Sequence, residues 1–243
     1  MKKTIISILI FSLCLVFAGQ KEFVRDYTYQ ASEIDSKVTA RTNASTEIRN
    51  ILLREIGQFI ISTQSMSNND DYSEKVQAIT AGIVEMVIIT EKWNGQEYYI
   101  QAKMTVDEKD VEKRINEIMK DYQRTNEFRD ARKRALEAEM EVMSMRNNKA
   151  APNSYKEKVT LLAVEDDFTS AMAAYENGRY AASLEYLNNS LKSGANKANI
   201  YYMLGKVYAG MNETKKSDEY FKKSANMGHP AAQYRIRNKG YHK

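Results

Sequence analysis

The feature that most constrains this chain is a sequence repeat near its C-terminal end. Four pairs of identical or similar residues stand in one register: Tyr186 with Tyr220, Leu187 with Phe221, Ser190 with Ser224, and Gly194 with Gly228. A fixed period of this size, about 34 residues, is typical of helix hairpins that stack and bury one face against their neighbours. Such arrays leave a groove, so the pattern favours binding over catalysis.

The helices of this region are predicted from their apolar spacing and from the residues that end them. We expect helices over residues 155–177, 180–192, 199–210 and 213–227, and a short one over 231–238. Asn177 and Gly178 accept the left-handed backbone conformation in which a helix ends, and Gly228 ends a later helix in the same way. A helical-repeat domain is therefore predicted over residues 155–243.

Residues 1–18 have the pattern of a secretory signal peptide. The basic start Met1-Lys2-Lys3 precedes an apolar run from Ile5 to Ala18, shorter than the ~20 residues that a membrane span needs. We expect cleavage, export, and a periplasmic or outer-membrane-associated location, with an uncleaved anchor as the alternative. Cys14 is the only cysteine, so the mature chain has no disulfide, and Leu13 departs from a lipid-attachment box.

The charge balance argues against a nucleic-acid partner. The chain has 36 basic and 32 acidic residues, and cleavage would remove two of the basic ones. So small an excess gives no global attraction to a polyanion. From Lys215 onward, however, eight basic residues stand against two acidic ones. They form either a solvated face or a patch for an anionic envelope polymer or lipid headgroup.

Residues 19–106 are predicted to form a small α+β domain. Alternation predicts a strand over 23–31, and an apolar stripe that follows a capping Asp35 or Ser36 predicts a helix. A polar loop is expected over 64–73. Asn94-Gly95 predicts a two-residue hairpin turn, in which Trp93 pairs with Gln96.

In this register the first hairpin strand is apolar on both faces. It is therefore expected at the centre of the sheet, with the 23–31 strand along its other side. The predicted pairs are Ile89 with Ile100, Val87 with Ala102, Glu85 with Met104, and Ile83 with Val106. Glu85 interrupts the apolar face, either as a functional carboxylate or because a bulge near Gly82 turns it outward.

No glycine or proline interrupts the segment from Asp107 to Met145. We therefore predict one long, half-exposed connecting helix over 107–145 and a linker over 146–154. Within the helix Met140, Met143 and Met145 are soft ligands suited to Cu(I), but methionine is also an adaptable packing residue. Because no cysteine or nearby histidine assists them, no metal and no cofactor are predicted.

Residues 164–234 resemble a tetratricopeptide-type array. The string from Ala225 to Tyr234, Ala-Asn-Met-Gly-His-Pro-Ala-Ala-Gln-Tyr, is similar to the Sel-one-like subclass. Ala171 and Gly205 stand where the helices of such a hairpin approach closely. The copies are divergent, because Ser170 replaces the family's usual leucine, and Ser183 and Ser217 replace its usual alanine.

The resemblance implies that the first helix of each hairpin lines a concave groove. By register, the groove residues are Glu165, Phe168, Met172, Tyr175, Asn199, Tyr202 and Lys206. Aromatic and methionine side chains bury the apolar side chains of a peptide, while Asn199 and Lys206 would hold its backbone or a carboxylate. The alternative is that Phe168 and Tyr175 only pack against the preceding helix.

The N-terminal part resembles a bacterial envelope domain. The segment from Tyr27 to Ser36, Tyr-Thr-Tyr-Gln-Ala-Ser-Glu-Ile-Asp-Ser, followed by Ala40-Arg41 and Ala44, is similar to the N-terminal domain of flagellar assembly protein T and related secreted lipoproteins. The likeness covers about residues 23–118 and implies a non-catalytic envelope protein. The missing lipid box departs from the lipoprotein members.

The sequence thus predicts an α+β N-terminal domain of order β-α-β-β-α, joined by a long helix to an all-α helical-repeat domain. His229 and His242 are the only histidines, and no nucleophile–base pair surrounds them, so no enzyme is predicted. We expect an exported adaptor whose groove binds a peptide segment of another envelope or secreted protein. The alternative is a structural component of an envelope-spanning motility or secretion assembly, bound through the α+β domain.

Overall fold

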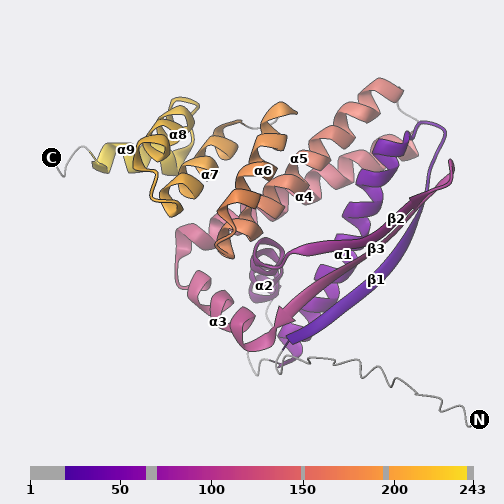
Figure 1. Ribbon diagram of the computed structural model, residues 1–243, viewed down its shortest axis with the longest axis horizontal. Coiled ribbons are helices and arrows are strands. Elements are labelled where there is room, and N and C mark those ends of the chain that lie inside the picture. Colours follow the sequence, from indigo (N-terminus) through magenta and orange to yellow (C-terminus); the bar gives the residue numbers. More distant parts are fainter. Residues whose placement is uncertain (1–19, 64–69, 149–150, 194–196, 240–243) are drawn as a thin grey trace, which may run out of the picture.

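The computed structural model describes residues 20–63, 70–148, 151–193 and 197–239. This part of the chain is mostly helical, with a small three-stranded antiparallel sheet on its N-terminal side (Figure 1). The elements are β1 (Gln20–Gln30), α1 (Lys37–Thr63), α2 (Asp70–Ile83), β2 (Met86–Trp93), β3 (Glu97–Asp107), α3 (Glu108–Met119), α4 (Tyr122–Asn147), α5 (Pro152–Glu176), α6 (Tyr180–Lys192), α7 (Lys197–Gly210), α8 (Thr214–Asn226) and α9 (Pro230–Lys239).

The predicted signal peptide lies outside the described residues. None of the described helices combines the length and the apolar character that a membrane span requires.

The central strand of the sheet is β3, not the first hairpin strand as predicted. The strand order is β1-β3-β2, and both neighbours run antiparallel to β3. Alternate side chains of β3 are buried, namely Tyr98, Ile100, Ala102, Met104 and Val106. Helix α1 packs across this inner face (Figure 1). The reciprocal bonds between Ser36 and Thr39 confirm Ser36 as a capping residue at its start.

The predicted hairpin register was wrong by two residues at the turn. The Asn94 amide donates to the carbonyl of Glu97 at 3.2 Å, and Trp93 pairs with Tyr98. The turn is therefore Gly95–Gln96, and Gly95 has a φ of 103°. The Asn94 side chain closes the turn by accepting from the backbone amides of the second and third residues after it, at 2.9 and 2.7 Å.

Helix α2 was not predicted: its first residues were assigned to a loop, Ile83 was assigned to a strand, and residues 74–82 were assigned to no element. Ile83 ends α2 instead of pairing with Val106, and β2 begins only at Met86. Glu85, between them, pairs with Arg179 at the start of α6. No bulge occurs at Gly82; the register shift lies farther on, between Ile88 and Thr90.

Gly82 allows a close contact between α2 and α4. A Cβ atom at this position would lie 2.2 Å from the ring of Phe128, which is itself only 2% exposed. Only glycine leaves room for the ring at this distance. The glycine that suggested a bulge therefore marks the place where two helices approach.

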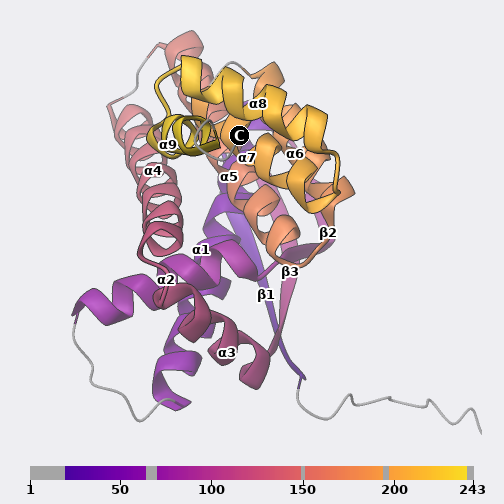
Figure 2. The same cartoon turned by 90° about the vertical axis from the view of Figure 1, so that its left-hand side faces the viewer.

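The single helix predicted over 107–145 is wrong. Helix α3 ends at Met119, and the side chain of Asp121 caps a new helix by accepting from the amide of Arg124 at 3.0 Å. A capping aspartate begins a helix without any glycine or proline, so the break left no strong signal. Helix α4 then lies against α2 and α5 (Figure 2).

The linker between α4 and α5 is shorter than the 146–154 segment predicted for it. Helix α4 continues to Asn147, and α5 begins at Pro152. The three methionines near the end of α4 do not gather on one face: Met145 packs beside the buried Val142, whereas Met140 and Met143 are 69% and 47% exposed.

The hairpins from α5 to α8 repeat one set of hydrogen bonds. Serine hydroxyls on the second helix of each hairpin donate to carbonyls of the first helix, in the register of the sequence repeat: Ser183 to Ala171, Ser217 to Gly205, Ser190 to Val164, and Ser224 to Ala198. These serines are buried, so the bonds satisfy hydroxyls that would otherwise be unpaired. The loop residues Gly178 and Asn212, which stand in the same register, both have positive φ.

Helix α5 is joined to the α+β part by a polar network. The Tyr155 hydroxyl donates to Asp35 and accepts from the Asn43 amide, both at 2.8 Å. The Tyr29 hydroxyl also donates to Asp35, at 3.1 Å. Burial raises the pKa of the Asp35 carboxyl, but the hydrogen bonds it accepts, including those from Ser32, outweigh burial and leave the pKa below its usual value.

Farther along α5, a pair of neighbouring carboxyls faces α1. Asp166 accepts from the Thr46 hydroxyl at 2.7 Å and lies 3.9 Å from the Arg49 guanidinium. Burial, and then the charge of Asp166, raise the pKa of Asp167 from 3.8 to about 6. The ionised form of Asp167 therefore opposes folding above that pH.

We predict that Asp167→Asn stabilises the protein in a pH-dependent way. The folded-state pKa of about 6 exceeds the unfolded value of 3.8, so the cost of ionising Asp167 is absent well below pH 3.8 and complete above pH 6. The urea midpoint of the variant should match that of the parent near pH 3 and exceed it increasingly up to pH 7. Asp166→Asn, which loses the contacts to Thr46 and Arg49, should lower the midpoint at pH 7. A difference for Asp167→Asn that does not grow with pH would contradict the assignment.

Candidate functional site

A pocket of about 340 Å³ opens between α4, α5, α7 and the start of α9. Helix α4 forms one wall, from Tyr122 to Arg134, and α9 closes the end with Pro230 and Ala231. The pocket therefore lies where the helical hairpins meet a helix that precedes them in the chain.

The floor of the pocket is apolar. Phe168, Met172 and Met203 line it and are only 8%, 4% and 3% exposed. The ring of Tyr202 stacks on His229, with centroids 4.2 Å apart and planes 12° apart. Burial lowers the pKa of His229, so its ring is neutral at pH 7 and adds no charge to the floor.

Glu127 of α4 ties this wall to α7. Its carboxylate accepts from the Tyr202 hydroxyl at 3.0 Å and from the Lys206 ammonium at 2.8 Å. Burial, and then the charge of Glu127, raise the pKa of Tyr202, which stays protonated as the donor. Both charged side chains of the ion pair are mostly shielded, at 22% and 19% exposed.

A second, more polar hollow of about 510 Å³ adjoins the pocket across Glu127. Lys206 lies in it, with its ammonium 5.2 Å from the centroid of the Tyr175 ring. The ion pair of Arg124 with Glu176 also lines this hollow. The ammonium of Lys206 is thus already shared between a carboxylate and an aromatic face.

The seven residues predicted for the groove divide among three places. The pocket holds Phe168, Met172, Asn199 and Tyr202, the polar hollow holds Tyr175, Tyr202 and Lys206, and the contact between α4 and α5 holds Glu165. Glu165 pairs with Arg134 at 3.2 Å, and burial raises its pKa. The Arg134 guanidinium in turn lies 5.1 Å from the Phe168 ring centroid, so Phe168 both packs under α4 and lines the pocket.

Sequence reasoning missed the contribution of α4. Tyr122, Asn126 and Asp130 line the pocket from this helix, and Tyr122 is 82% exposed. A helix that covers residues much later in the chain leaves no local pattern, so only the structure reveals it. Within the part of the chain that the structure describes, the side chains of Asn126, Asp130 and Asn199 make no hydrogen bond or ion pair.

Comparison with protein-family models, with curated proteins and with solved structures finds no match to this chain. Among the described residues, no group of three or more histidine, cysteine, aspartate or glutamate side chains is placed to hold a metal ion.

We predict that Glu127 and Lys206 are energetically coupled. A double-mutant cycle in urea with Glu127→Gln and Lys206→Met should give a coupling free energy of about 1 kcal/mol or more, because the pair is mostly shielded from solvent. The pair of Lys133 with Glu137 on the same helix is 74% and 63% exposed and 3.8 Å apart, so the matching cycle should give no measurable coupling. Equal couplings in the two cycles would show that Glu127 does not hold α4 against α7.

Proposed function

We propose that this protein is an exported, non-enzymatic adaptor, and that its pocket between α4, α5, α7 and α9 binds a segment of another envelope or secreted protein. The observation that carries the proposal is the pocket itself: an apolar floor beneath polar side chains that have no partner among the described residues. Largely preformed apolar pockets with a few convergent polar groups are typical of binding sites.

The dimensions and chemistry of the pocket favour a peptide segment. A volume of about 340 Å³ accommodates one or two large side chains, and Phe168 and Met172 offer them an aromatic and a thioether surface. Asn126 and Asn199 stand on different helices, and each side-chain amide donates and accepts hydrogen bonds. Together they suit a peptide backbone, which presents both an N–H and a C=O group at each residue.

The helical repeats supply a rigid frame for such a site. The recurring serine bonds and loop conformations support our interpretation of the hairpins as divergent tetratricopeptide-type units. Two units are fewer than the three that usually stack into a stable array. In our proposal α4 and α9 cap the array, and α4 narrows the concave face to a site for a short segment.

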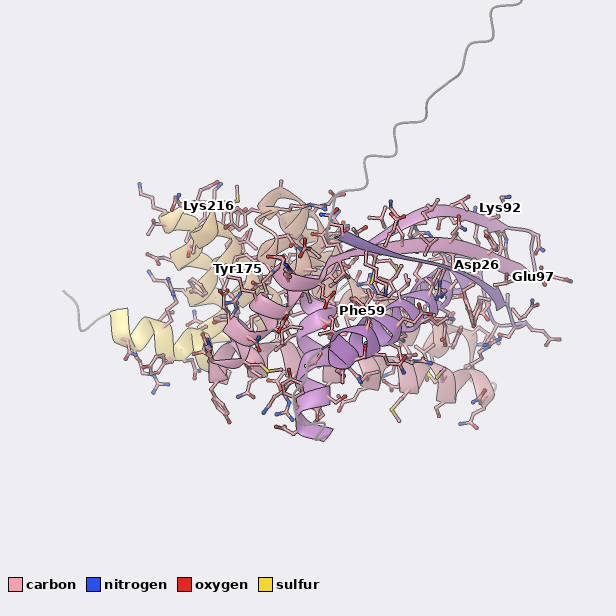
Figure 3. All side chains as sticks on the ribbon, turned by 90° about the horizontal axis from the view of Figure 1, so that it is seen from below. Asp26, Phe59, Lys92, Glu97, Tyr175 and Lys216 are labelled. Atoms are coloured by element: carbon pink, nitrogen blue, oxygen red, sulfur yellow. The ribbon has the colours of Figure 1, made fainter. Side chains whose placement is uncertain are left out.

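One observation favours the alternative of a structural component bound through the sheet. The outer face of the sheet is mostly exposed on β1 and half-buried on the central strand β3, and Val87 and Ile89 of the edge strand β2 are 51% and 48% exposed. Asp26 and Lys92 lie on the sheet at one end of the molecule, while Tyr175 lies toward the other end (Figure 3). The two candidate surfaces are therefore far enough apart to be tested separately.

We expect a photo-crosslinking amino acid at position 122 to capture a defined partner in the native cell envelope. Tyr122 is exposed at the pocket, so this replacement preserves the fold. The same probe at position 87 reports on the sheet, and at position 38 it serves as a control, because Val38 is 70% exposed and does not line this pocket. The adduct at position 122 should disappear when Asn199→Ala is added.

The three positions separate the functions. An adduct at position 122 that Asn199→Ala removes supports the adaptor. A defined adduct at position 87 alone would instead support the structural component. Asn188→Ala, an exposed asparagine on α6, is the matched control for Asn199→Ala and should leave every adduct unchanged.

A further inference from the structure

We propose that the peptide segment bound in this pocket carries a basic residue one or two positions from a bulky apolar residue, and that Asp130 selects it. This inference rests on the proposed function and adds the chemistry of the ligand. It depends on which charges at the pocket are already neutralised within the protein.

Among the described residues three charged side chains line the pocket, and two of them are paired. Glu127 holds the Lys206 ammonium at 2.8 Å. Arg134 holds Glu165 at 3.2 Å. Both pairs are mostly shielded from solvent, so neither offers a free charge to a ligand.

Asp130 is the third charged side chain, and it is exposed at the pocket without an ion pair or hydrogen bond among the described residues. The basic residue before it, Arg129, is engaged with α2, where it lies 3.1 Å from Glu74 and 3.7 Å from Asp71. The free charge at the pocket is therefore one carboxylate. A ligand that supplies a cation there forms a new ion pair without breaking an existing one.

The position of Asp130 fits a basic side chain next to a buried apolar one. Asp130 follows Asn126 by four residues on α4, so both lie on one face of the helix, and both line the pocket. When an apolar ligand side chain occupies the floor at Met172, a neighbouring lysine or arginine extends along the wall on its long aliphatic stem. Its charged end then reaches the carboxylate at the edge.

The same arrangement disfavours an acidic segment. The only cation that lines the pocket among the described residues is Arg134, which is already paired with Glu165. An acidic ligand side chain would meet the carboxylates of Asp130 and Glu127 with no free cation to balance it. Selectivity thus combines attraction of one class of peptide with repulsion of another.

Three fluorescent heptapeptides test the inference. Each has Leu-Phe at its centre, and they differ only in the residue before leucine, which is lysine, glutamine or glutamate. With the mature chain, the lysine peptide should bind about two- to fivefold more tightly than the glutamine peptide, as one solvent-accessible ion pair allows, and the glutamate peptide should bind most weakly. Asp130→Asn should make the lysine and glutamine peptides equal, and Asp130→Lys should reverse the order. High salt should shrink every difference.

Glu137→Lys provides the matched control, because it makes the same change of charge on α4 at a residue that does not line this pocket. It should leave the order of the three peptides unchanged. If the three peptides bind equally, and Asn199→Ala weakens them all, the inference is wrong while the proposed function stands. If none binds, or if Asn199→Ala changes nothing, both the inference and the assignment of the pocket are wrong.

Discussion

The carboxylate of Asp35 accepts hydrogen bonds from three different elements of the structure, one of which lies 120 residues farther along the chain. Tyr29 comes from β1, Thr39 from α1 and Tyr155 from α5. Buried polar groups are tolerated only when they are paired, so this network fixes how α5 lies on the α+β layer. Farther along α5, Asp166 continues the contact with α1 through Thr46. The position of α5 in turn decides where the hairpins that follow it begin.

Helix α4 covers the hairpins that follow α5 and forms one wall of the candidate site. It is held against α5 through Arg134 and against α7 through Glu127, while Phe128 packs into the space left by Gly82 on α2. The ion pairs of Arg134 with Glu165 and of Glu127 with Lys206 neutralise charges that would otherwise face the concave side of the hairpins. What stays open is an apolar floor with polar groups at its edge, including Asp130, that have no partner among the described residues. The shape of the pocket is therefore a consequence of how α4 docks, and not of the repeats alone.

Local signals predicted the hairpins well. Helix α6 begins and ends where the sequence placed it, because Gly178 frees the loop before it and the apolar spacing defines its buried face. Ser183 and Ser217, which replace the usual alanine of the tetratricopeptide pattern, also have a physical reason, since each donates across its hairpin. Four of the seven predicted groove residues line the pocket, but the wall that faces them was not foreseen.

The errors arose where tertiary contacts or capping competed with local pattern. Ile83 and Val84 were assigned to the hairpin strand and residues 74–82 to no element, so α2 was missed; a short apolar run suits a buried strand and a helix equally well. Asp121 caps the start of α4 without a glycine or proline before it. Asn94 shifts the hairpin turn because its side chain accepts hydrogen bonds from the backbone of the turn. The central position of β3 depends on its pairing with β1. Two helices and strand β2 separate these two strands in the chain, and no local signal encodes their pairing.

The most direct test of the central claim, that the space enclosed by α4 is the binding site, is a titration of methionine methyl groups by NMR. Met172 and Met203 line the pocket, whereas Met140 and Met143 are exposed on α4 outside it. Addition of the lysine-containing Leu-Phe peptide should shift the methyl resonances of Met172 and Met203 and leave those of Met140 and Met143 in place. Shifts confined to Met140 and Met143, or no shift at all, would contradict the account.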